Sequence, residues 1–140
     1  MKKHQSGVAL LEALLAILIL AIGLLGTIGL QARAYSALND AGQRSEATIA
    51  TEKLLGLMAN DQANLAAYAI NTGVAPTSPQ LQNWYAETLA AIPNAGIKVA
   101  VTAPPAGSTR TQVDIAISWQ RKGGDAGNVH RVTAYLAQSL

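Results

Sequence analysis

The distribution of hydrophobic and polar residues divides this chain into two parts. Residues 8–30 are almost entirely apolar and hold one ionisable side chain, that of Glu12, whereas polar and apolar residues are mixed along the rest of the sequence. As an α-helix these roughly 23 residues would be about 35 Å long, and the hydrocarbon core of a bilayer is about 30 Å thick. The pattern therefore predicts a membrane-spanning helix, followed by one modest domain with its own core.

After residue 30 the apolar residues follow a helical repeat. No proline interrupts residues 31–58, and small or apolar residues recur there at intervals of three and four. We therefore expect the membrane helix to continue as an amphipathic helix to about Asn60, roughly 80 Å in all. Asp40 and Arg44 should lie mostly outside its apolar stripe. The predicted stripe consists of Ala34, Leu38, Ala41, Ser45, Ile49, Glu52 and Leu55, widened near its end by Leu54, Leu57 and Met58.

A shorter helical region is predicted next. Residues 61–70 favour one or two further helical turns, and a loop rich in proline and glycine follows them. Ser78 followed by Pro79 is typical of a helix N-terminus. In the helix predicted from there, Trp84 and Tyr85 are interpreted as core residues rather than ligand contacts. Its apolar side consists of Leu81, Trp84, Tyr85, Thr88, Leu89 and Ile92.

Three strands are predicted in the C-terminal part, over residues 97–102, 111–119 and 129–137. In the first two, alternate residues are apolar, as in strands that bury one face. The connecting loops contain proline or glycine, which favours an antiparallel meander with one face on the long helix and the other polar. The predicted fold is therefore α+β. For the last strand two inward faces are possible, and we favour His130, Val132, Ala134 and Leu136 over Val129, Arg131, Thr133 and Tyr135.

Charge and composition exclude several classes of function. The ten basic and eight acidic residues are dispersed, and without Lys2 and Lys3 they balance, so no nucleic-acid partner is predicted. The absence of cysteine excludes a disulfide framework, a thiolate metal site and a lipid-modified cysteine anchor. His4 and His130 are the two histidines, and no phosphate-binding glycine loop or nucleophile elbow occurs. We therefore predict no catalytic function, metal, cofactor or small-molecule substrate.

The apolar N-terminal run by itself is compatible with more than one kind of segment. It could be an uncleaved signal anchor, with Lys2 and Lys3 kept in the cytoplasm and the rest of the chain across the membrane. It could be a secretory signal peptide, because residues 32–34 (ARA) resemble an A-x-A cleavage site. The run is, however, longer than the usual apolar region of about 7–15 residues. Neither interpretation explains Gly7 or Glu12.

A third interpretation does explain these two residues. A charged side chain at the centre of a membrane helix costs about 2.5–3.5 kcal/mol, less near the end, and such a residue needs a partner. Cleavage between Gly7 and Val8 would create one, a new α-amino group four residues before Glu12, cationic near pH 7 in water. Between two staggered helices this pair would fix their axial register, which is the best-attested use of a buried charge pair.

These residues resemble the type IV prepilin signature, in which a short basic leader ends in glycine and glutamate is the fifth residue after the cut. Here the signature reads MKKHQSG followed by VALLEALLAILILAIGLLG. The stretch LLEALLAILILAIGLLG is most similar to minor pilins of the PilV type, and pseudopilins of type II secretion are close relatives. The resemblance implies cleavage after Gly7 by prepilin peptidase, N-methylation of Val8, and pairing of Glu12 with the N-terminus of a neighbouring subunit.

The resemblance also implies an architecture and a set of partners. It divides the chain into a leader (residues 1–7), a transmembrane and assembly helix (8–30) and a periplasmic pilin-like domain (31–140) that includes the amphipathic half of the helix. The expected function is that of a minor pilin, held in the inner membrane and then incorporated into a pilus or at its tip. Expected partners are major and minor pilins, prepilin peptidase and the inner-membrane assembly platform. The alternatives are a type II secretion pseudopilin or, less favoured, a signal-anchored periplasmic binding domain.

Three glycines interrupt the apolar run at regular intervals. Gly23, Gly26 and Gly29 recur every three residues. Glycine allows the backbones of membrane helices to approach closely. It also softens a helix, since each interior glycine costs about 1 kcal/mol relative to alanine. A helix that leaves the lipid and repacks in a filament could use either property, and the sequence favours neither.

Overall fold

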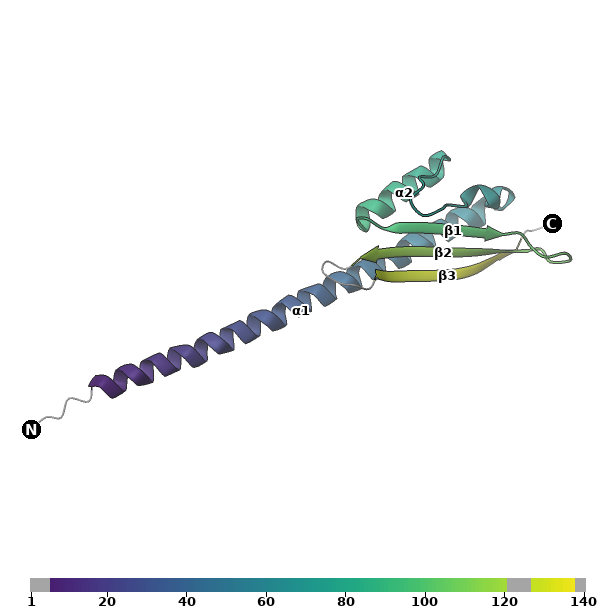
Figure 1. Ribbon diagram of the computed structural model, residues 1–140. Helices are drawn as coiled ribbons and strands as arrows, with labels where there is room; N and C mark the ends of the chain where they lie inside the picture. Colours follow the sequence, from purple (N-terminus) through teal and green to yellow (C-terminus); the bar gives the residue numbers. More distant parts are fainter. Residues whose placement is uncertain (1–5, 121–126, 138–140) are drawn as a thin grey trace, which may run out of the picture. The chain divides into compact units, whose positions relative to one another are not determined.

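The computed structural model describes residues 6–120 and 127–137, and the chain divides into two compact units, residues 1–39 and 40–140. In chain order its regular elements are α1 (Ser6–Asn60), the 3₁₀ helix η1 (Gln62–Tyr68), α2 (Pro79–Ala91), β1 (Gly96–Thr102), β2 (Arg110–Gln120) and β3 (Gly127–Ala137). Helices α1 and α2 and the three strands are labelled in Figure 1.

Helix α1 is continuous over 55 residues, and its end at Asn60 confirms the predicted length. In the first unit, every residue from Val8 to Asn39 is exposed. By length and composition, α1 is the one helix among the described residues able to cross a membrane, and its most apolar window has a mean hydropathy of 2.9. The first unit therefore has no core of its own among residues 8–39.

The three strands form an antiparallel meander in the order β1-β2-β3. Ile97 pairs with Ile117 in β2, which in turn pairs with His130 in β3, so the inward faces of the strands coincide. In β3 the residues on this side are half-buried and the alternate residues are exposed, which confirms the favoured inward face. Together with α1, this sheet confirms the predicted α+β class, a long helix packed on a small three-stranded sheet as in the pilin-like fold.

The core of the second unit lies between the sheet and the helices. Every second residue of β2 from Thr111 to Trp119 is buried, because β2 is the central strand and its inward face is fully covered. Helix α2 begins where predicted: the hydroxyl of Ser78 accepts a hydrogen bond from the Leu81 backbone N–H. The side chains that α1 and α2 bury in this core are Ala47, Ala50, Thr51, Leu54, Met58, Leu81, Trp84 and Thr88.

The predicted stripe on α1 was right for Leu54 and Met58, which are buried, and wrong for most of its other members, which are exposed. Ile49 is 44% exposed, whereas Ala47 and Ala50, close to it in sequence, are buried. At 100° per residue, Ile49 lies about 200° around the helix from Ala47, so the two occupy opposite sides. The side that α1 buries carries both small and large residues, among them Ala47, Leu54 and Met58. The residues of the predicted stripe that are exposed are Ala34, Leu38, Ala41, Ser45, Ile49, Glu52 and Leu57.

Candidate processing and assembly site

The first turn of α1 contains the residues that the sequence singled out for processing. The helix begins at Ser6, so the Gly7–Val8 bond lies within its first turn. Val8 and Glu12 are both exposed and, four residues apart, lie on the same side of the helix. Among the described residues, none makes a hydrogen bond or ion pair with Glu12. Lys2 and Lys3 lie outside the described residues.

This arrangement has a simple chemical consequence. If the Gly7–Val8 bond were cut, the new α-amino group would lie one helical turn from the Glu12 carboxylate. The N-terminal end of a helix also carries a partial positive charge, which favours a carboxylate nearby. A subunit processed in this way would present both a cation and an anion at the tip of an otherwise apolar helix, and both could pair with a second subunit.

The three glycines of the apolar segment have no packing partner among the described residues. A Cβ added at Gly23, Gly26 or Gly29 would meet no heavy atom within 4 Å. At three-residue intervals they spread over about 120° of the helix circumference. Packing inside the folded chain therefore does not require glycine at these positions, and contact with another helix or local softening both remain as explanations.

The apolar half of α1 also lacks cover along its whole length. Its large hydrophobic residues from Val8 to Leu30 are all at least half exposed. Burying one such side chain is worth about 1.5–3 kcal/mol. The segment therefore requires an apolar surrounding that the described chain does not supply, either lipid or the helices of other subunits.

Comparison with known proteins bears on this same segment. Residues 2–28 match the family model of the prokaryotic N-terminal methylation motif, which is type IV prepilin-like. The match includes Gly7, Val8, Glu12, Gly23 and Gly26, and it ends before Gly29. No curated protein and no solved structure gives a significant match to the chain.

The motif and the fold together define a class of protein. A type IV prepilin-like N-terminus precedes an exposed apolar helix, and that helix continues onto a small antiparallel sheet. These features support a precursor of the type IV pilin and pseudopilin superfamily, whose members are structural subunits. The motif implies processing by prepilin peptidase and assembly with other pilins.

A polar cluster that the sequence did not reveal lies where the second unit begins. Asp40 Oδ1 accepts hydrogen bonds from Asn128 Nδ2 (2.7 Å) and Trp119 Nε1 (3.4 Å), and its Oδ2 lies 3.4 Å from Arg44 Nε. Arg44 also donates to Asn128 Oδ1 (3.0 Å), and its guanidinium lies over the Trp119 ring. We call these four residues the Asp40 clasp. Only 13% of the Asp40 side chain is exposed, which corrects the expectation that Asp40 faces away from the buried side.

The clasp joins three elements. It ties α1 to the end of β2 and to the start of β3, so it closes one end of the β2–β3 hairpin. This chain has no cysteine, so no disulfide can make such a link. Hydrogen bonds to a mostly buried carboxylate supply a non-covalent link in this part of the domain.

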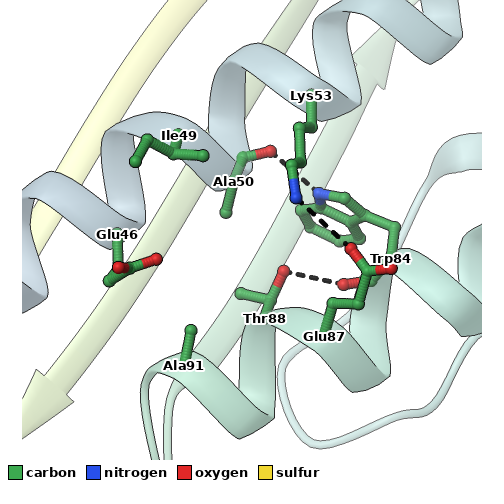
Figure 2. A pocket seen from close by; sticks show the side chains of 8 residues that line it. All are labelled: Glu46, Ile49, Ala50, Lys53, Trp84, Glu87, Thr88 and Ala91. Atoms are coloured by element: carbon green, nitrogen blue, oxygen red, sulfur yellow. Dashed lines mark hydrogen bonds and ion pairs between the residues drawn. The ribbon is translucent and has the colours of Figure 1, made fainter.

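A shallow hollow between α1 and α2, about 40 Å³ in volume, shows how the second helix is fixed (Figure 2). Trp84 Nε1 donates to the Ala50 carbonyl at 2.8 Å, and Thr88 Oγ1 donates to the Trp84 carbonyl at 2.8 Å. At the rim, Lys53 Nζ lies 3.4 Å from Glu87 Oε2. These polar groups are engaged with one another, so the hollow is a helix–helix joint. As the sequence predicted, Trp84 belongs to the core.

On the outer face of the sheet, Asp114 is held by its neighbours. Its carboxylate accepts hydrogen bonds from Thr133 Oγ1 and Gln112 Nε2. These hydrogen bonds, that from Thr133 first, stabilise the ionised form and hold the pKa of Asp114 below its usual value. The described residues contain no group of three or more His, Cys, Asp or Glu side chains placed to hold a metal ion.

Proposed function

We propose that this chain is a type IV minor pilin of the PilV type, cut after Gly7 and carried into a filament by helix α1. The observation that supports this most strongly is the combination in the first turns of α1. Four residues after the Gly7–Val8 bond lies Glu12, which has no partner among the described residues. It stands near the start of an apolar helix that no described part of the chain covers. A plain anchor would need the apolar helix but neither Gly7 nor Glu12.

In this proposal one segment has three successive uses. The uncut helix holds the precursor in the inner membrane, with residues 1–7 in the cytoplasm and the domain of residues 31–140 in the periplasm. Prepilin peptidase then cuts after Gly7, and Val8 becomes N-methylated. Finally, Glu12 pairs with the N-terminal amine of a neighbouring subunit and fixes the stagger of the two helices.

The second half of α1 supports the same role. In the second unit, α1 buries one side in the domain and leaves the opposite side exposed. The exposed side includes Ile49 and three positions with little or no side chain, Gly42, Ser45 and Gly56. Small residues allow close helix approach. A helix of this kind is suited to packing between its own sheet and the helices of neighbouring subunits.

The proposed work is association and not catalysis. The partners are other major and minor pilins together with the inner-membrane assembly platform, and the subunit lies in the pilus shaft or at its tip. No cofactor, metal, nucleic acid or small-molecule substrate takes part. The final location is the pilus on the cell surface.

The mature N-terminus tests this proposal directly. Mass spectrometry of the protein isolated from membranes should find a chain that begins at N-methylated Val8. A chain beginning at Tyr35 would show a secretory signal peptide, and an intact Met1 would show an uncleaved anchor. Either of these two results contradicts the proposal.

A second experiment separates a pilin from a pseudopilin, because both share these N-terminal features. A minor pilin should be recovered with pili sheared from the cells, and its deletion should reduce piliation. If deletion leaves pili unchanged and blocks type II secretion, the chain is a pseudopilin.

A further inference from the structure

Among the described residues, the outer edge of β3 is unpaired. The opposite edge of the sheet, on β1, is partly paired, because Val99 and Ile70 exchange backbone hydrogen bonds of 2.9 Å. Within residues 6–120 and 127–137, no segment pairs with β3 on the side away from β2. The edge is long: all 11 residues of β3 pair with β2 in one unbroken register. The backbone groups on its far side are therefore available to another strand.

This edge lacks the features that usually prevent strand addition. Proteins protect free edges with proline, β-bulges, several charges or very short strands. β3 has no proline and no bulge, and Arg131 is the one Asp, Glu, Lys or Arg in it. Val129 and Tyr135 are exposed on its outer face, Tyr135 to 63%, and both residue types favour strands. An unprotected 11-residue edge is a template for pairing.

The inward side of β3 is also incompletely covered. In β2 the inward residues are fully buried, whereas Val132, Ala134 and Leu136 in β3 are only half-buried. His130 Nε2, on the same side, is buried and has no hydrogen-bond partner among the described residues. One further strand beyond β3, with apolar residues facing inward, would cover these side chains. Incomplete cover and an unpaired edge therefore occur on the same side of the sheet.

The outer face indicates the charge that an added strand would carry. Lys98, Ala116 and Arg131 form one row across the three strands, because Lys98 pairs with Ala116 and Ala116 with Arg131. Neither cation of this row takes part in an ion pair among the described residues. The acid of the next row, Asp114, is already engaged by Thr133 and Gln112. On an added strand, an acidic residue directly opposite Arg131 would attract it, and a basic residue there would repel it.

We propose that the β3 edge binds an extended segment of a different protein chain, which adds a fourth strand to the sheet. The segment carries alternating apolar residues toward the helix side and an Asp or Glu opposite Arg131. Strand addition of this type draws its affinity from backbone hydrogen bonds and its specificity from alternate side chains. The inference goes beyond the filament proposal, since a chain that stayed anchored could use the same edge.

A second copy of this chain fits the edge poorly. Two β3 strands paired antiparallel within one continuous sheet are related by a two-fold axis perpendicular to that sheet. Residues 40–60 of α1 lie against the sheet, so in the two copies they would run in opposite directions. Two chains held by the same end in one membrane do not satisfy this arrangement. A different partner with a free extended segment has no such restriction.

The test uses the full chain in detergent and a synthetic peptide of seven residues. The peptide alternates valine with threonine and carries glutamate at its centre, so that the valines share one face and glutamate lies on the other. Hydrogen exchange followed by mass spectrometry should show new protection in β3 on binding, with β1 unchanged. Replacing the central glutamate by lysine should weaken binding roughly fivefold, as expected for exchanging attraction for repulsion across a strand pair.

Variants of the chain then locate the charge contact. Arg131→Glu should reverse the preference, so that the lysine peptide binds more tightly than the glutamate peptide. Lys98→Glu is the matched control, an exposed cation of the same row on the other edge strand, and it should leave the preference unchanged. A peptide with methylated backbone amides should lose binding. The proposal is wrong if Arg131→Glu does not change the preference between the two peptides. It is also wrong if protection appears outside β3, or if the full chain pairs with itself through β3.

Discussion

The two halves of α1 show how one continuous helix can be built for two different surroundings. Residues 8–30 are apolar on every side except at Glu12, and all of them are exposed. The described chain therefore does not bury their side chains. Residues 40–60 are amphipathic, and one side of them is buried against the sheet by Ala47, Leu54 and Met58. The first half depends on lipid or on other subunits, and the second half on its own domain. Substitutions in the two halves should therefore fail in different ways.

The largest effect is expected at Glu12. Glu12→Ala removes one member of the proposed charge pair, and removing one partner of a buried pair costs about 3–5 kcal/mol. The variant should still insert in the membrane, because the substitution makes the helix more apolar. Its recovery in sheared filaments should fall more than tenfold, measured against its level in membranes.

Glu87→Ala is the matched control for this prediction. Glu87 is an exposed acid of α2, outside the helix proposed to assemble, and its 3.4 Å pair with Lys53 is also exposed. This variant should assemble normally. Normal incorporation of Glu12→Ala would contradict the register argument and would leave Glu12 without an assigned role.

One leucine from each half of α1 tests whether the two halves differ in their contribution to the free energy of unfolding. Leu54 is fully buried and Leu25 is 69% exposed. Leu54→Ala should lower the free energy of unfolding of the second unit by about 2–5 kcal/mol, through lost burial and the cavity left behind. Leu25→Ala should leave it unchanged. Denaturant titration of the full chain in detergent, followed by tryptophan fluorescence, is suitable because Trp84 and Trp119 are both buried in the second unit.

The same experiment on the Asp40 clasp should give an intermediate result. Asp40→Ala leaves the donors of Asn128 and Trp119 without their acceptor, which costs about 1–3 kcal/mol for a buried group. Hydrogen exchange should rise first at the start of β3, where the clasp holds the strand. Asp40→Asn keeps one acceptor oxygen and should lose less. If both variants were as stable as the parent, the clasp would contribute nothing to the free energy of unfolding.

The element types could be predicted from the sequence because their signals are local. The apolar run, the Ser78–Pro79 cap and the alternation in β2 each depend on neighbours within a few residues. The motif around Gly7 and Glu12 is equally local, and the match to the N-terminal methylation motif covers it. The roles proposed for these residues depend on a second subunit, so a single chain does not test them.

The side of α1 that the sheet covers was not predictable in this way. Around Ile49 the helix has apolar or small residues on both sides, so periodicity alone offers two stripes. Residues distant in sequence determine which side is buried. For example, the Trp84 indole N–H donates a hydrogen bond to the Ala50 carbonyl, 34 residues earlier. The Asp40 clasp was hidden for the same reason. Its i, i+4 pair with Arg44 is visible in the sequence, but Trp119 and Asn128 lie 79 and 88 residues from Asp40 along the chain.

The smallest effect is expected when the pH is lowered, and it should change the free energy of unfolding of the second unit only. The lowered pKa of Asp114 means that its hydrogen-bonded ionised form adds stability above the unfolded pKa, about 3.9 for an aspartate. That contribution should be lost as the pH falls from about 4 through the lowered pKa. Asp114→Asn cannot titrate, so the stability difference between parent and variant should shrink over this range and vanish below it. Tryptophan fluorescence measures this difference, and a gap that stayed constant from pH 6 to pH 2 would show that the hydrogen bonds from Thr133 and Gln112 do not depend on charge.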